Sequence, residues 1–194
     1  MAEKPVDRRV RKTRAVLRQG LVRLMAEKSI QDITVTELCA ACDVNRGTFY
    51  LHYTDVFELL HSVEDELLAE FERVLDSLTP HTVFSGETPS PAMCRMLELL
   101  ADNADLCRVL LCQNGDMAFV ERVKGVVRHR VLDEWAAQFF ERGAHAAVYH
   151  YAYEFVVSGC IGMLQYWMER DMPLSAREMA AMMESFIARG VTGL

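Results

Sequence analysis

Two features in the first third of the chain could bind a charged polymer: a concentration of basic residues and a short polar and aromatic run. The first 23 residues hold eight basic and two acidic side chains, whereas residues 56–194 hold 11 basic and 21 acidic ones. A basic segment on an acidic chain favours binding of a polyanion by that segment alone. A solvated basic face on the first helix would produce the same charge distribution, so the charge leaves both interpretations open.

The short run is residues 46–53, with the sequence RGTFYLHY. Phe49 and Tyr53 are four residues apart, so on a helix they share one face and are expected to pack against their own domain. Arg46 lies outside that face and could bind a guanine edge through two hydrogen bonds, or a phosphate through its charge. Gly47 would let a nucleic-acid backbone come close.

Cys39 and Cys42 form a CxxC pair, a spacing that in other proteins binds zinc or exchanges disulfides. No second CxxC or histidine pair stands nearby to complete four zinc ligands, and no strand–helix–strand pattern surrounds the pair. Two small buried thiols are the simpler interpretation, with redox sensing as the open alternative. His150 and Glu154 also share a helix face, but a surface pair is simpler than a metal site, so neither a metal nor a cofactor is predicted.

The first third of the chain is predicted to form helices, which position these residues. Apolar residues recur at helical spacing over about residues 6–28, with basic residues elsewhere around the helix. Thr34 and Glu37 match a capping box, in which each side chain binds the backbone of the other residue. The helix that this box begins is expected to end near Cys42.

A tight turn is expected between this second helix and a third one. Asp43 tolerates the left-handed backbone that a chain often adopts where it leaves a helix. Asn45 is a favourable N-cap for the third helix, over residues 46–53. Two short helices joined by a tight turn, behind a longer helix, form a helix-turn-helix pattern.

The rest of the chain shows helical periodicity and no strand-like alternation. Asp55 and Glu58 match a second capping box, and residues 79–91 predict a surface loop because they hold three prolines and one glycine. The fold class is therefore all-α with about nine helices. Those that follow the first three are expected over residues 56–78, 91–103, 104–112, 117–142, 144–170 and 176–189.

The first 60 residues resemble the DNA-binding domain of the TetR family of bacterial transcriptional regulators. The run that carries the resemblance is Ile33-Thr34-Val35-Thr36-Glu37-Leu38-Cys39, then Val44-Asn45-Arg46-Gly47-Thr48-Phe49-Tyr50-Leu51-His52-Tyr53, then Asp55 and Leu59-Leu60. The resemblance implies a helix-turn-helix DNA-binding domain over residues 1–54. It also implies a helical ligand-binding and dimerisation domain over residues 55–194.

The resemblance and the helix-face argument together give the expected DNA-binding residues. Thr34 and Thr36 align with family positions that contact phosphates, and Thr48, Tyr50 and His52 align with positions that contact phosphates or base edges. A packed aromatic is the alternative for Tyr50, and a solvent-facing histidine is the alternative for His52. The full set is Thr34, Thr36, Asn45, Arg46, Gly47, Thr48, Tyr50, Leu51 and His52.

Two residues depart from the family pattern. Many members have glycine where this chain has Asp43, and an acidic side chain there would weaken or redirect DNA binding. Many also have lysine where this chain has Val56, so the phosphate contact of that lysine is not expected here. The basic segment from Arg8 to Arg14 is a candidate to compensate through phosphate or minor-groove contacts.

For the second domain the resemblance implies a homodimer built by the last two long helices, and a small-molecule effector. Small and aromatic residues over 144–170 fit close helix contact, and 11 methionines and many aromatics could line an apolar cavity. Plain core packing is the alternative for each of them. The candidate ligand-binding residues are Met96, Leu100, Phe119, Trp135, Tyr149, Tyr153 and Trp167.

The expected function is that of a homodimeric repressor that leaves a pseudo-palindromic DNA operator when an effector binds. A regulator switched by a protein partner or by Cys39/Cys42 oxidation is the alternative. An enzyme is not expected, because the sequence has no glycine-rich phosphate loop, GxSxG or HExxH motif. No apolar run of membrane-spanning length and no secretory signal is visible, so a cytoplasmic protein is expected.

Overall fold

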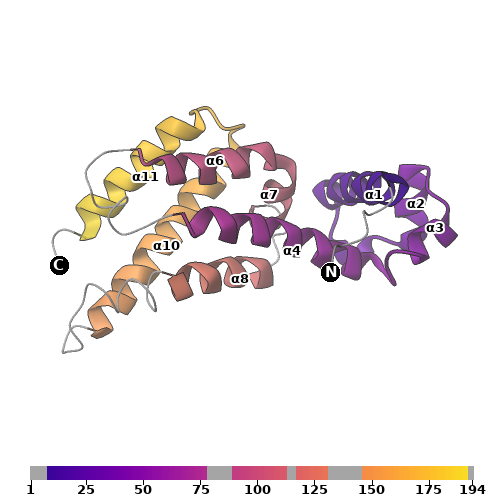
Figure 1. The fold of residues 1–194 in the computed structure, drawn as a ribbon, viewed down its shortest axis with the longest axis horizontal. Helices are drawn as coiled ribbons and strands as arrows, with labels where there is room; N and C mark the ends of the chain where they lie inside the picture. Colours follow the sequence, from indigo (N-terminus) through magenta and orange to yellow (C-terminus); the bar gives the residue numbers. More distant parts are fainter. Residues whose placement is uncertain (1–7, 78–88, 113–116, 131–145, 192–194) are drawn as a thin grey trace, which may run out of the picture. The chain divides into compact units, whose positions relative to one another are not determined.

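A computed structural model describes residues 8–77, 89–112, 117–130 and 146–191 (Figure 1). Within these residues the chain forms nine α-helices and one short 3-10 helix, with no strand, which confirms the all-α prediction. No helix in the described part is long and apolar enough to cross a membrane. The α-helices are α1 (Arg8–Glu27), α2 (Val35–Cys42), α3 (Arg46–Tyr50), α4 (Val56–Leu75), α6 (Pro91–Asp102), α7 (Ala104–Leu111), α8 (Met117–Arg128), α10 (Ala146–Glu169) and α11 (Ala176–Val191).

The chain divides into two compact units, Met1–Leu67 and Leu68–Leu194. Helix α4 begins in the first unit and ends in the second, so both units share it. The functional division expected between residues 54 and 55 falls just before this shared helix and stays a prediction. The predicted loop over residues 79–91 lies almost wholly outside the described residues, as does the end of the helix predicted over 117–142. The described helix there, α8, ends at Arg128.

In the first unit, α1 packs directly on α2 through a glycine. A Cβ atom added to Gly20 would lie 2.1 Å from the Sγ atom of Cys42 and 3.2 Å from a methyl carbon of Leu38. The Cys42 thiol donates a hydrogen bond to the Val16 carbonyl at 3.4 Å, which fixes it against α1. Leu17 and Leu38 are fully buried in the same region. Only a residue without a side chain fits at position 20 while Cys42 keeps this place.

Replacing Gly20 with alanine is therefore expected to lower the free energy of unfolding by about 1–3 kcal/mol, because it overpacks the α1–α2 contact. Cys42→Ala should restore most of this loss, since the added Cβ atom would then face the Cβ of residue 42 at an ordinary 3.8 Å. Denaturant unfolding of the two single variants and the double variant measures the coupling. A double variant as unstable as Gly20→Ala alone would contradict this account.

In the second unit, α6 lies beside α11 (Figure 1). A buried carboxylate joins the two helices. The two carboxylate oxygens of Glu184 on α11 accept hydrogen bonds from the backbone N–H of Ser90, at 3.1 and 3.0 Å. The Ser90 hydroxyl donates to the same carboxylate and accepts from the backbone N–H of Met93 at 3.2 Å. Ser90 is the N-cap of α6 and Pro91 is the first helical residue, as expected. The start of α6 is thus fastened to α11.

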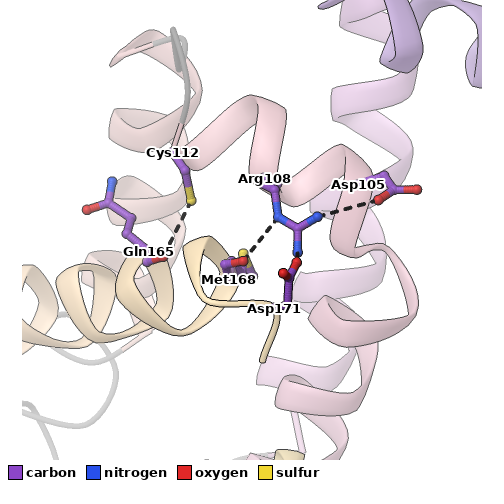
Figure 2. A network of polar contacts seen from close by, with 6 residues as sticks. All are labelled: Asp105, Arg108, Cys112, Gln165, Met168 and Asp171. Atoms are coloured by element: carbon purple, nitrogen blue, oxygen red, sulfur yellow. Dashed lines mark hydrogen bonds and ion pairs between the residues drawn. The ribbon is translucent and has the colours of Figure 1, made fainter. Parts of the chain in front are cut away.

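A second polar network ties α7 to the end of α10 (Figure 2). The Arg108 guanidinium donates from Nε to the Met168 carbonyl at 3.1 Å and from Nη2 to Asp171 Oδ1 at 3.1 Å. Gln165 Nε2 donates to the Leu111 carbonyl at 2.6 Å. Asp171 is in a left-handed conformation just after α10. Arg108 therefore binds both the last turn of α10 and Asp171, two residues beyond its end.

Candidate nucleic-acid interface

The interface is built on α2, the turn after it and α3, and the caps of these helices define it. Thr34 is the N-cap of α2, and its hydroxyl accepts from the Glu37 backbone N–H at 3.2 Å. The reciprocal half of the predicted capping box is replaced, because the Glu37 carboxylate binds Lys28 Nζ at 2.6 and 2.7 Å. This charge-assisted contact lowers the pKa of the Glu37 carboxyl group. It also fastens the start of α2 to the residue that follows α1.

The turn between α2 and α3 has the expected form. Asp43 adopts a left-handed backbone, with φ 52° and ψ 42°. The backbone N–H of Val44 donates to the Cys39 carbonyl at 3.0 Å, which closes the turn. Asn45 then caps α3, because its Oδ1 atom accepts from the Gly47 backbone N–H at 2.7 Å.

The predicted length of the third helix was wrong, because α3 ends at Tyr50 and not at Tyr53. Residues 51 and 52 form a turn, in which the His52 backbone N–H donates to the Phe49 carbonyl at 2.9 Å. The residues that precede α4 require α3 to end here. The Glu58 carboxylate accepts from both the backbone N–H and the hydroxyl of Thr54, at 2.6 and 2.7 Å. The chain must leave the helix before Thr54 for α4 to begin.

The inner face of α3 is buried as predicted. Phe49 has no exposed surface, and Tyr53 is also buried, with the two ring centroids 5.9 Å apart. The Arg14 guanidinium of α1 lies 5.9 Å from the centroid of the Tyr53 ring. Arg14 thus contacts the residue that follows α3 by three positions, while α3 itself packs on α2 and leaves its other side outward.

All nine predicted DNA-binding residues keep at least part of their surface accessible. Thr48 and His52 are partly exposed, and the other seven are exposed. Tyr50 is 51% exposed, so it is not a core aromatic, although its ring edge touches Phe49. The Arg46 guanidinium lies 6.0 Å from the centroid of the Tyr50 ring, which orients both side chains outward. Their contact with DNA stays a prediction.

The two departures from the family pattern have different structural settings. Val56 is buried in the core at the start of α4, so its side chain has a packing role. Asp43 is exposed in the turn beside α3, where its charge faces solvent. The basic residues Arg8, Arg11 and Arg14 are exposed along the start of α1. Residues 1–7 lie outside the described part.

The CxxC pair shows no feature of a reactive thiol. Cys39 is buried, Cys42 is partly buried, and both are free thiols. Burial raises the pKa of both thiols, which lowers the fraction of reactive thiolate at neutral pH. Cys42 also fills the space opposite Gly20. A packing role therefore explains the pair better than redox sensing.

Five of the seven candidate ligand-binding residues are buried: Met96, Leu100, Phe119, Tyr153 and Trp167. Tyr153 donates its hydroxyl to the Lys124 carbonyl at 2.6 Å, and Trp167 Nε1 donates to the Leu174 carbonyl at 2.9 Å. Trp135 and the side chain of Tyr149 lie outside the described residues. Of the His150 and Glu154 pair, Glu154 forms an ion pair with Arg128 at 2.6 Å.

Two cavities open in the second unit, and none of the five described ligand candidates lines either of them. One, of about 370 Å³, lies between α7, α8 and α10, and it includes Lys124 and Gln165 in its wall. The other, of about 580 Å³, lies between α4 and α8, with Arg122 and Glu72 among its lining residues. The ligand-binding residues predicted from the sequence are all large and mostly apolar, so they include none of these polar residues. No described group of three His, Cys, Asp or Glu side chains could hold a metal ion.

Comparisons with known proteins agree with this architecture. A family model for the TetR-type transcriptional regulator C-terminal region matches residues 87–189. The uncharacterized HTH-type transcriptional regulator YxbF of Bacillus subtilis (strain 168) is 31% identical over 101 residues, covering 52% of this chain and 27% of that protein. The chain thus matches about a quarter of the length of this curated relative.

Solved structures share the fold over nearly the whole chain. A TetR transcriptional regulator from Streptococcus agalactiae 2603V has a TM-score of 0.60 at 20% identity, covering 93% of this chain and 96% of that one. The fatty acid degradation regulator FadR from Bacillus halodurans has a TM-score of 0.63 at 12% identity, covering 98% of each chain. At these identities the similarity shows the fold alone.

Proposed function

Since the chain belongs to the TetR family of transcriptional regulators, we propose that it is a homodimeric repressor that binds a pseudo-palindromic DNA operator. Residues 1–54 would bind DNA, and residues 55–194 would form the dimer and bind a small-molecule effector. The main support for DNA binding is that α3 exposes Arg46, Gly47 and Tyr50 while its Phe49 is buried. A repressor of this kind acts where the chromosome is, so we propose a cytoplasmic location.

Selection of binding sites from a random DNA pool tests this proposal. The purified protein should enrich a two-fold symmetric sequence at near-physiological salt, where non-specific binding is weak. Two half-sites about one helical turn or a multiple of it apart would match two α3 helices in successive major grooves. Failure to enrich any sequence, from protein shown by mass spectrometry to carry no bound molecule, would count against DNA regulation.

Arg46→Ala should weaken operator binding about 5- to 150-fold per half-site, corresponding to the 1–3 kcal/mol of a bidentate base contact. If Arg46 binds guanine, the loss will be confined to the operator and preference at one base pair will relax. If it binds a phosphate, affinity will fall for all sequences, with a shallower salt dependence. Arg73→Ala, at an exposed arginine of α4 in the second unit, is the matched control and should leave binding unchanged. Unaltered binding by Arg46→Ala would remove Arg46 from the interface.

The proposed dimer surface lies on α10 and α11. Along α10, Tyr151, Phe155 and Tyr166 are exposed, and a Cβ atom added at Gly159 or Gly162 would meet nothing within 4 Å. On the neighbouring α11, Met182 and Phe186 are also exposed. Aromatic side chains around small residues allow close packing of helices and bury a large apolar area. A second copy of the same surface, related by two-fold symmetry, would cover it.

Phe155→Glu is expected to convert the dimer into a monomer, because it places a charge in the centre of the apolar surface. Sedimentation velocity at several concentrations measures the change. Met117→Glu is the matched control, since Met117 on α8 is 70% exposed and Phe155 is 76% exposed, yet Met117 lies outside α10 and α11. The proposal of this surface fails if both variants remain dimeric, or if both become monomeric.

We propose that the effector binds in the second unit. Its binding would favour one distance between the α3 helices of the two subunits. An effector that binds the DNA-incompetent state more tightly shifts the population away from the operator. The cavity of about 370 Å³ has a size suited to a small molecule, and its wall combines the apolar residues Leu111 and Ile161 with the polar Lys124 and Gln165.

A further inference from the structure

The exposed side of α3 and its C-cap carries two pairs of residues and one further polar residue. In a helix, residues four apart lie on the same face, one turn above the other. Arg46 pairs with Tyr50 in this way, and the 6.0 Å distance from the guanidinium to the ring centroid shows that the two side chains meet. Leu51 pairs with Gly47 in the middle of the exposed side. Thr48 lies on the other side of this pair, and His52 follows in the turn after α3.

Leu51 is the outermost side chain of this arrangement. Its backbone is still helical, with φ −74° and ψ −15°, so it stands about 200° around the helix axis from the buried Phe49. It is 80% exposed, the largest value among the exposed large apolar residues of the described chain. Phe49 and Leu51 are therefore on opposite sides of α3, one in the core and the other in solvent.

Gly47 leaves the space beside Leu51 unobstructed. The position carries no side chain, and a Cβ atom added there would meet Asn45 Oδ1 at 3.1 Å, on the side of the N-cap. The centre of the exposed side is thus an apolar side chain with an empty position next to it. Polar groups that can bind phosphates or base edges stand on its two flanks, those of Arg46 and Tyr50 on one side and that of Thr48 on the other.

An apolar centre is suited to one feature of the major groove. Among the base edges there, the C5-methyl group of thymine is the apolar one, while the others present hydrogen-bond donors and acceptors. A leucine that entered the groove beside other edges would leave those groups dehydrated without a partner. We propose that Leu51 is a specificity-determining residue that contacts a thymine methyl group in each operator half-site. This inference rests on the proposed DNA-binding function.

Replacing thymine with uracil removes this methyl group and leaves base pairing unchanged. Each thymine of the selected operator should be replaced in turn, in both half-sites, and the Kd measured by fluorescence anisotropy at constant salt. For the wild-type protein, one position should weaken binding about fourfold per half-site, the equivalent of about 0.8 kcal/mol for one buried methyl-sized group. Leu51→Ala should bind the thymine operator more weakly and lose its sensitivity to uracil at that position.

Leu51→Met is the matched variant, because it keeps an apolar side chain of similar size and should keep the sensitivity. Leu51 is exposed, so neither substitution should alter the thermal unfolding of the protein. Equal uracil sensitivity in the wild type and Leu51→Ala would overturn the role of Leu51, and so would the absence of any sensitive thymine. A protein that selects no DNA sequence overturns the proposed function too, whereas a symmetric operator without methyl dependence overturns this inference alone.

Discussion

Phe49→Ala is expected to abolish operator binding by unfolding the first unit, while the second unit stays folded. Phe49 is fully buried and contacts both Tyr50 and Tyr53. Truncating a buried phenylalanine costs about 3–5 kcal/mol, a large part of the 5–15 kcal/mol that stabilises a whole domain. Circular dichroism should show loss of part of the helical signal, and sedimentation should show an unchanged oligomeric state.

Tyr50→Ala is the control for this prediction, since it removes the neighbouring aromatic ring from the exposed side of α3. It should reduce DNA affinity while leaving the unfolding curve close to that of the wild type. The two variants therefore distinguish Phe49, which holds α3 in place, from Tyr50, which is exposed on α3. A Phe49→Ala protein with a wild-type unfolding curve would contradict the burial argument.

Glu184→Ala should lower the free energy of unfolding of the second unit by about 3 kcal/mol. The substitution leaves the backbone N–H and hydroxyl of buried Ser90 without their acceptor, and it opens a cavity between α6 and α11. Chemical denaturation followed by circular dichroism measures the loss. Because α11 carries part of the proposed dimer surface, dimer affinity should fall with it.

Two further variants test whether this loss comes from the buried hydrogen bonds. Glu184→Gln keeps one acceptor oxygen for Ser90 and should lose less stability than Glu184→Ala. Glu178→Ala removes an exposed carboxylate of the same helix, which caps α11 by accepting from Ser175, and should have a much smaller effect. Similar losses of stability for Glu178→Ala and Glu184→Ala would show that the buried hydrogen bonds of Glu184 do not account for its effect.

The local features of the first unit could be predicted because short-range chemistry determines them. The caps at Thr34 and Asn45, the left-handed Asp43 and the shared face of Phe49 and Tyr53 all depend on residues within a few positions. The end of α3 could not be predicted because the expected capping box joined Glu58 to Asp55, whereas Glu58 binds the backbone N–H and hydroxyl of Thr54.

Long-range contacts explain what could not be predicted. Glu37 completes an ion pair with Lys28 instead of its local capping box, and Glu184 binds a serine 94 positions away. Arg108 binds Asp171 across 63 positions. No periodicity in the sequence distinguishes these charged residues from those of a solvated helix face, because their partners are brought near only by packing.

Asp43 bears on how tightly the proposed repressor could bind DNA. A residue other than glycine in the left-handed region carries a conformational cost of about 1 kcal/mol, and here it also places a negative charge beside the side of α3 proposed to meet a polyanion. Asp43→Gly would remove the strain and the charge together. A single substitution would then raise both the stability of the turn and the affinity for DNA. A regulator that must release its operator gains from weaker binding, so Asp43 fits selection for reversibility rather than for maximal occupancy.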